Sequence, residues 1–171
     1  SRFGLAKNFD NVVEKTEEDG DAFRVEQICS STEGQYVDLY TTRGQMPPRK
    51  AALESGLYYI GGDAQEIKDL AIERYLKMIR ALLPTAAERK GIRWILTHQV
   101  NRQITDLVIS TAELSGEVIW SARDIGNIGG ASILYTLADC VEKNLFQPGD
   151  RILLMSVGGG LSYAAQVWEK L

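Results

Sequence analysis

Three stretches in the last third of the chain hold the residues that could do chemistry. They are Thr97-His98-Gln99-Val100-Asn101, Gly126-Asn127-Ile128-Gly129-Gly130 and Gly158-Gly159-Gly160, and His98 is the only histidine in the sequence. The first and third follow apolar runs typical of buried strands, and the second lies at a strand-to-helix turn. Because many α/β sites are built where strands end, we expect His98, Asn127 and the glycine loop to converge on one pocket.

The elements that must position these residues follow from hydrophobic periodicity and helix-capping signals. From residue 63 the predicted order is helix, strand, helix, strand, helix, strand, strand. The predicted ranges are helices 63–83, 101–116 and 130–145 and strands 93–97, 117–121, 151–157 and 161–168. This order is typical of an α/β layered domain with a mostly parallel five-stranded sheet, an antiparallel edge and helices on both faces.

The first part of the chain is predicted to be an end piece followed by a connection. Residues 11–18 and 23–30 are interpreted as two strands of an antiparallel hairpin. Residues 30–49 are polar and rich in turn formers, which predicts a surface loop long enough to help line a pocket. Residues 86–91 are interpreted as a charged connection. The predicted division is an end piece with its connecting loop at 1–50 and a main domain at 51–171.

Composition narrows the class of protein. At 171 residues, with 44% hydrophobic and 25% charged residues, the chain can form one domain with a proper core. Its net charge of −4 argues against a general nucleic-acid binder. We expect no membrane span and no signal peptide. The two cysteines, Cys29 and Cys140, have no metal-ligand or disulfide spacing, so no metal site is expected and a cytoplasmic location is the natural hypothesis.

Together the three stretches resemble the C-terminal half of the thiolase-fold condensing enzymes, in particular ketoacyl-acyl carrier protein synthase III. That family has a His-Gln-x-Asn stretch, then a Gly-Asn stretch, then a glycine-rich loop near the C-terminus. Here these read His98-Gln99-Val100-Asn101, Gly126-Asn127 and Gly158-Gly159-Gly160. The Gln147-Pro148-Gly149-Asp150 turn also looks like the family. The resemblance covers roughly residues 55–171 well and residues 1–45 loosely.

The resemblance implies a decarboxylative Claisen condensation of an acyl thioester with a malonyl thioester, as in fatty acid or polyketide biosynthesis. His98 and Asn127 would stabilise the enolate that forms when malonyl loses carbon dioxide, with His98 donating through its neutral N–H. An amide of Gly158, Gly159 or Gly160 would help bind the tetrahedral oxyanion. Asn101 and Arg102 are weaker candidates for substrate binding. Coenzyme A or phosphopantetheine thioesters would be substrates, and no permanently bound cofactor is expected.

The chain departs from the family in what it lacks. The family's nucleophilic cysteine lies at a helix start in the N-terminal half, whereas Cys29 falls on a predicted strand and Cys140 inside a predicted helix, so neither is a credible nucleophile. The family's basic residue after the asparagine falls at Gln103, with Arg102 one place before it. We therefore expect a partner N-terminal half or cysteine-bearing chain, an acyl carrier protein or acyl-coenzyme A, and a homo- or heterodimer.

The same residues also allow other interpretations. The chain could be an acyltransferase of the same fold, moving an acyl group to oxygen or nitrogen with His98 as general base, or a non-catalytic partner subunit. His98 could be an ordinary core or surface histidine, and Asn127 a turn residue with positive φ. The glycines could merely let two strands turn, and Asn101 could be a helix cap.

Overall fold

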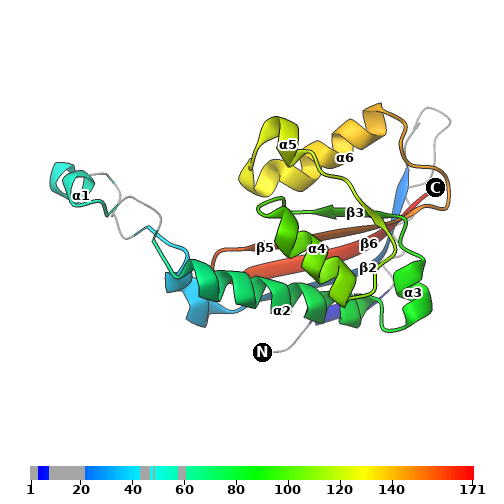
Figure 1. Cartoon of the computed structure of the whole chain (residues 1–171), viewed down its shortest axis with the longest axis horizontal. Helices are drawn as coiled ribbons and strands as arrows, with labels where there is room; N and C mark the ends of the chain where they lie inside the picture. Colours follow the sequence, from blue (N-terminus) through cyan, green and yellow to red (C-terminus); the bar gives the residue numbers. More distant parts are fainter. Residues whose placement is uncertain (1–3, 8–21, 43–46, 48, 58–60) are drawn as a thin grey trace.

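A six-stranded sheet in the order β1-β2-β6-β5-β3-β4 forms the centre of the molecule (Figure 1). The computed structural model describes residues 4–7, 22–42, 47, 49–57 and 61–171, and only the backbone of 4–7. The strands are β1 (Gly4–Lys7), β2 (Phe23–Thr32), β3 (Trp94–Thr97), β4 (Glu117–Val118), β5 (Arg151–Gly158) and β6 (Ser162–Lys170).

The α/β prediction with helices on both faces is confirmed, but the sheet is mixed and has six strands rather than five. β3 runs parallel to β4 and β5, whereas β5–β6, β6–β2 and β2–β1 are antiparallel. The reason is local, because the short loop 159–161 can only join antiparallel neighbours. β2 then extends the sheet by pairing with β6 from Phe23↔Lys170 to Thr32↔Ser162.

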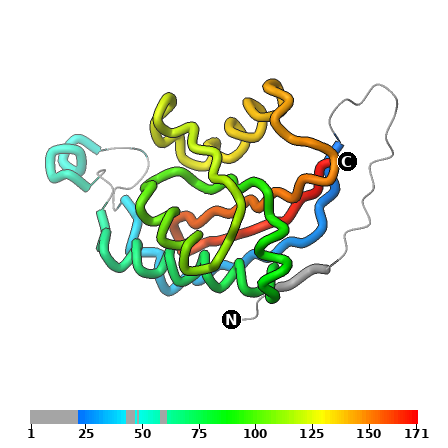
Figure 2. Tube along the Cα trace, turned by 45° about the vertical axis from the view of Figure 1, so that its right-hand side comes forward, coloured from blue at the N-terminus to red at the C-terminus, as the bar shows by residue number. Residues whose placement is uncertain are grey.

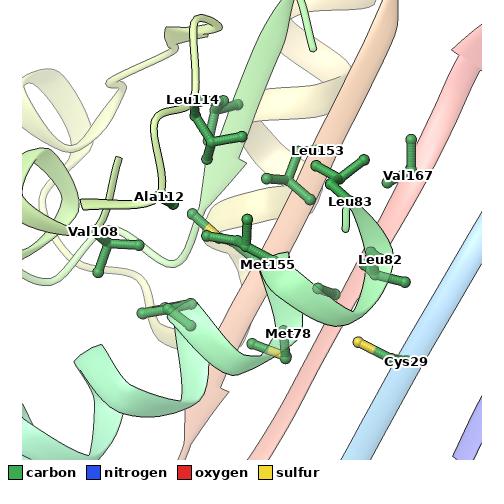
Figure 3. Packing of buried hydrophobic residues seen from close by; sticks show 14 of the residues in the cluster. Cys29, Met78, Leu82, Leu83, Val108, Ala112, Leu114, Leu153, Met155 and Val167 are labelled. Atoms are coloured by element: carbon green, nitrogen blue, oxygen red, sulfur yellow. The ribbon is translucent and has the colours of Figure 1, made fainter. Parts of the chain in front are cut away.

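Helices α2 (Ala64–Leu82) and α4 (Arg102–Thr111) cover one face of the sheet. Asp63 caps α2 at the start of the predicted helix 63–83, because its side chain accepts hydrogen bonds from the backbone N–H groups of Gln65 and Glu66 at 2.9 Å each. Side chains from α2, α4 and the following turn meet those of β5 and β6 in one core (Figure 3). Met78 and Leu153 are fully buried there, so this face is closed.

The opposite face carries the short α5 (Ala122–Ile125), the 3-10 turn η2 (Gly129–Ala131) and α6 (Ser132–Glu142) (Figure 2). A second cluster of buried residues forms under α6 and the chain that follows it. Its members are Trp94, Leu96, Cys140, Phe146, Ile152 and Leu154. α6 therefore packs on this cluster through Ile133, Leu137 and Val141. Leu134 and Ala138, which the sequence pattern placed on the same apolar side, are exposed instead.

Several predicted connections are helical. Residues 86–91 contain α3 (Ala86–Lys90), which has a complete capping box between Thr85 and Glu88. The expected loop 30–49 contains the last three residues of β2 and the 3-10 helix η1 (Gly34–Leu39). α1 (Lys50–Glu54) follows it and lies away from the sheet in Figure 1.

The predicted ends of two elements were also wrong. α4 ends at Thr111 and not at Gly116, because Glu113 takes up the left-handed conformation that commonly ends a helix (φ 55°). The strand predicted at 117–121 is only Glu117–Val118, because α5 begins at Ala122.

The front of the chain joins the same sheet. The predicted strand at 23–30 is β2, while the predicted strand at 11–18 lies outside the described residues. β2 pairs antiparallel with β1 on one side and with β6 on the other. The division of the chain near residue 50 stays a prediction.

Candidate functional site

A cavity of about 420 Å³ lies at the carboxyl ends of β3 and β5. One wall is apolar and comes from η1 and the first turns of α2, with Tyr36, Leu39 and Ile67 facing the cavity. The other wall is polar and contains His98, Asn101, Asn127 and the loop Gly158–Gly160. The structure thus brings the three predicted stretches to one pocket, as expected.

His98 is held by the sheet through its backbone. It follows β3, whose four residues are all buried, and its N–H donates to the carbonyl of Met155 on β5 at 3.1 Å. Burial lowers the pKa of His98, and a hydrogen bond with the backbone of Gly129 opposes that shift. The imidazole is therefore neutral at neutral pH. Its Nδ1 is buried and has no hydrogen-bond partner among the described residues, while the residue as a whole is half-buried and lines the cavity.

Asn127 is oriented by its own turn. Its Oδ1 accepts the N–H of Gly129 at 2.9 Å, and this donor identifies which amide atom is the oxygen. The Nδ2 group then points elsewhere, and no acceptor among the described residues binds it. The positive φ angles of the turn belong to Gly126 (72°) and Gly129 (63°), so Asn127 itself is not a positive-φ residue. Asn127 can therefore offer N–H donors to a ligand.

The glycine loop joins β5 to β6 along the cavity floor. Gly160 has φ 119°, a conformation that residues with a side chain rarely adopt, so this glycine serves the turn. A Cβ on Gly159 would lie 3.4 Å from Cδ1 of Tyr40, so the loop packs closely on the chain that follows η1. Gly158 has open space where a Cβ would be. Both interpretations of the triplet hold in part, because the loop turns the chain and also exposes backbone to the cavity.

Gln99 connects the two segments that carry His98 and Asn127. It is buried, with 2% of its surface exposed. Its Nε2 donates to the carbonyl of Ile119 at 2.9 Å, and its Oε1 accepts the N–H of Ala122 at 2.6 Å. Sequence reasoning gave Gln99 no role, although it stands between His98 and Asn101 in the quoted motif.

A chain of hydrogen bonds continues from Gln99 toward Asn127. Its Nε2 also lies 3.4 Å from Oγ1 of Thr136, which is 2.6 Å from Oγ of Ser121. Thr136 donates to the carbonyl of Ser132 at 2.7 Å, and the Ser132 hydroxyl donates to the carbonyl of Gly129 at 2.8 Å. We call Gln99, Ser121, Thr136 and Ser132 the neutral network. It fixes the segment of Asn127 relative to that of His98.

The two weaker candidates for substrate binding, Asn101 and Arg102, differ in whether they line the cavity. Asn101 lines the cavity, but its Oδ1 already caps α4 by accepting the N–H of Gln103 at 2.9 Å. Arg102 is not part of the lining. It pairs with Asp106 at 2.8 Å and lies over the ring of Trp120 at 5.5 Å.

Neither cysteine is suited to nucleophilic attack. Cys29 and Cys140 are each 1% exposed, and burial raises the pKa of each thiol to about 11. A nucleophilic thiolate needs the opposite environment. Neither residue lines the cavity, which supports the expectation that this chain supplies no nucleophile.

Two other kinds of site are absent from the described residues. No group of three or more histidine, cysteine, aspartate or glutamate side chains there is arranged to hold a metal ion. No helix in this part of the chain has both the length and the apolar character that a membrane span requires.

Comparison with known proteins places these motifs in a family. Residues 85–170 match the family described as 3-oxoacyl-[acyl-carrier-protein (ACP)] synthase III C terminal. The chain is 28% identical over 159 residues to beta-ketoacyl-[acyl-carrier-protein] synthase III 3 of Streptomyces coelicolor, covering 90% of this chain and 48% of that protein. It is also 28% identical over 151 residues to the acetoacetyl CoA synthase NphT7 of Streptomyces sp. strain CL190, covering 84% of this chain and 46% of the relative.

The solved structures agree in fold. The crystal structure of 3-oxoacyl-(acyl carrier protein) synthase III from Pseudomonas aeruginosa superimposes with a TM-score of 0.67 at 21% identity, covering 86% of this chain and 44% of that one. The chain thus spans about half the length of the relatives that it matches.

Proposed function

Because the chain belongs to the 3-oxoacyl-[acyl-carrier-protein] synthase III C-terminal family, we propose that it is the C-terminal half of an enzyme performing decarboxylative Claisen condensation of an acyl thioester with a malonyl thioester. The observation that supports this most is one cavity in which a neutral histidine, an asparagine with free N–H donors and a backbone loop lie together. Those groups suit a reaction that develops negative charge on oxygen.

The reaction uses these groups in two steps. The malonyl carboxylate leaves as carbon dioxide, and the electron pair of the broken C–C bond forms an enolate whose oxygen accepts hydrogen bonds from His98 and Asn127. The enolate carbon then attacks the carbonyl of the enzyme-bound acyl thioester, and a backbone amide of Gly158–Gly160 helps stabilise the tetrahedral oxyanion. Collapse of that intermediate breaks the C–S bond and releases the cysteine thiolate and a β-ketoacyl thioester.

The nucleophilic cysteine comes from another segment or chain in this proposal. Buried Cys29 and Cys140 do not qualify, and the chain matches less than half of each relative. The α6 side of the molecule fits such a partner half, because Leu134 and Tyr135 are 68% and 46% exposed. Beside α6 the sheet bears an open hollow of about 400 Å³ lined by small side chains such as Ser30 and Ser156. We expect an interface of at least about 1,000 Å².

The substrates are thioesters of coenzyme A or of a carrier protein's phosphopantetheine. The apolar wall of η1 and α2 suits an acyl or pantetheine chain, and Lys68 on the same wall offers a cation for a phosphate. Two relatives named for acyl carrier protein and for acetoacetyl CoA fit these two thioester classes.

A second candidate is an acyltransferase of the same fold. The neutral imidazole of His98 at the cavity would serve it, because it could accept a proton from an attacking hydroxyl or amine. A non-catalytic subunit is less well supported, because His98 and Asn127 line one cavity together.

The test is His98→Ala in the enzyme reconstituted with its cysteine-bearing half. Malonyl decarboxylation should fall at least about a hundredfold, while acyl-enzyme formation, read by intact mass, stays near the unmodified rate. Lys90→Ala, an exposed change on α3 away from the cavity, is the control. Loss of acylation and decarboxylation together would favour the acyltransferase instead. An acyl group found on Cys29 or Cys140 after incubating this chain alone with an acyl-coenzyme A would refute the half-enzyme proposal.

A further inference from the structure

A buried charged cluster lies directly behind the glycine loop. Glu33, Arg74 and Tyr163 are 5%, 7% and 3% exposed. Both carboxylate oxygens of Glu33 are used, because Oε2 accepts from the Arg74 guanidinium at 2.7 Å and Oε1 accepts from the Tyr163 hydroxyl at 2.6 Å. Arg74 also pairs with Glu73 and lies 5.9 Å from the centre of the Tyr163 ring. We call Glu33, Arg74 and Tyr163 the charged cluster.

The charged cluster is joined to the end of the glycine loop by backbone hydrogen bonds of Glu33. The N–H of Glu33 donates to the carbonyl of Leu161 at 2.8 Å, and the N–H of Leu161 donates back to the carbonyl of Glu33 at 3.1 Å. Leu161 directly follows Gly160, and Tyr163 lies two residues further on. Glu33 also immediately precedes η1, so one residue connects the glycine loop to the apolar wall.

A buried ion pair is a costly way to hold two elements together. Apolar residues of the same volume often stabilise a fold as well or better, because charges must be removed from water. What such a pair contributes is orientation. A guanidinium that donates two N–H groups to one carboxylate fixes how the two side chains lie relative to each other. The Arg74 guanidinium holds the pKa of Glu33 below its usual value, so the carboxylate stays charged at neutral pH.

We propose that Glu33, held by Arg74 and Tyr163, is a positioning residue that fixes the backbone of Gly158–Gly160 against η1 and so sets where the loop amides point. The inference rests on the proposed function, in which one of those amides binds an oxyanion. Glu33 acts through the loop and does not contact substrate.

The first experiment reads the loop without any reaction. Glu33→Gln keeps the shape of the side chain and removes its charge. The amide NMR signals of Gly158, Gly159 and Gly160 should shift, and hydrogen exchange at Leu161 should become about tenfold faster. The matched control is Glu26→Gln, which breaks a 2.8 Å pair with Arg151 near the other end of β2. Loop signals that stay unchanged in folded Glu33→Gln, or that change equally in Glu26→Gln, would overturn the proposal.

Two further variants cover the case in which Glu33→Gln does not fold. Tyr163→Phe removes one 2.6 Å hydrogen bond and keeps the ring. Glu33→Gln combined with Arg74→Met removes both charges, so no unpaired ion remains buried. Each folded variant should show the same shifts of the loop amide signals as Glu33→Gln. Loop amide signals at their wild-type positions in both variants would also overturn the proposal.

The second experiment is kinetic and uses the reconstituted two-half enzyme. Condensation kcat should fall about tenfold while KM stays within about twofold, because a displaced oxyanion donor weakens transition-state binding more than substrate binding. A raised KM with unchanged kcat would overturn the positioning role. Shifted loop signals with unchanged kcat and KM would leave the anchor intact and refute the oxyanion role of the loop, so the two failures are distinguishable.

Discussion

The two polar sides of the cavity are held in place by different kinds of interaction. The neutral network holds His98 and Asn127 through amide and hydroxyl hydrogen bonds between the end of β3 and the turns around α5 and α6. The charged cluster holds the glycine loop through a buried carboxylate, a guanidinium and a phenol. The first kind positions side chains, and the second positions backbone.

This difference in the kind of interaction predicts how much stability a single substitution costs on each side of the cavity. Removing one member of a neutral network leaves partners unsatisfied, which costs about 1–3 kcal/mol. Removing one member of a buried ion pair leaves an uncompensated charge, which costs about 3–5 kcal/mol. The glycine-loop side should therefore be the more fragile of the two to single substitutions, although its pairing is the stronger.

The largest effect on the fold is expected for Arg74→Met. It leaves Glu33 charged, buried and without its guanidinium, and should lower the free energy of unfolding by about 3 kcal/mol. Urea unfolding followed by circular dichroism measures this loss. Adding Glu33→Gln to Arg74→Met should restore most of it, because no buried charge then lacks a partner.

The matched change for that experiment lies in another ion pair. Arg151→Met disrupts the pair with Glu26, whose side chains are 24% and 25% exposed, and should cost under about 1 kcal/mol through lost pairing. If Arg74→Met costs no more than Arg151→Met, or if the double change gives no recovery, the contrast between the two sides of the cavity does not hold.

A smaller loss of stability is expected for Gln99→Leu. Leucine has a similar volume but leaves the Ile119 carbonyl and the Ala122 N–H unpaired, at a cost of about 2 kcal/mol. In the reconstituted enzyme the loss of activity should be larger than stability alone explains, because the segments of His98 and Asn127 are no longer linked. Ser110→Ala removes a 3.0 Å hydroxyl hydrogen bond on α4 outside both the network and the cavity, and serves as control. A folded Gln99→Leu enzyme with the wild-type kcat would show that the neutral network stabilises the fold but does not affect the reaction.

Asn127→Asp separates orientation from chemistry. Aspartate can still accept the Gly129 N–H, so the free energy of unfolding should change by less than about 0.5 kcal/mol. It has no amide donors, so condensation should fall about a hundredfold. Asn127→Ala is the companion variant, because it removes the 2.9 Å turn bond as well and should cost about 1 kcal/mol. An active Asn127→Asp enzyme would remove Asn127 from the proposed mechanism.

The sequence predicted elements whose signals are local. Asp63 as the cap of α2 and the apolar runs of β3 and β5 could be identified from neighbouring residues alone. Thr85 and Glu88 also carried a local signal for α3 that was interpreted as a charged connection. The end of α4 was missed because Glu113 adopts a conformation that its residue type rarely takes.

The site divides in the same way. His98, Asn127 and the glycine loop were visible because strand ends and family motifs point to them. Glu33, Arg74 and Tyr163 were not, because Glu33 is 41 residues from Arg74 and 130 from Tyr163, and no periodicity connects them. The roles of Gln99 and Thr136 likewise depend on contacts across 37 residues. The residues proposed to do chemistry could be predicted, whereas those that contact and support them required the fold.

The smallest predicted effect is a difference in acid sensitivity between the two sides. Burial lowers the pKa of His98 below its ordinary 6.5, so the unfolded chain takes up this proton before the folded one as the pH falls. Stability should therefore decline as the pH drops from 6.5 toward the folded pKa. The pKa of Glu33 is lowered from 4.5, so its contribution is present above 4.5 and is lost only as the pH falls through a still lower folded value. Mild acid should weaken the His98 side alone.

Urea unfolding between pH 7 and 5.5 can isolate this effect, because His98 is the only histidine in the chain. In His98→Gln the free energy of unfolding should lose its slope over that range, since glutamine binds no proton. Glu33→Gln combined with Arg74→Met should keep the slope of the unmodified chain, because neither Glu33 nor Arg74 titrates there. A slope that survives in His98→Gln would assign the effect to another titrating group, and a slope that disappears in the double variant would show that the two sides of the cavity are electrostatically coupled; either result would break the comparison.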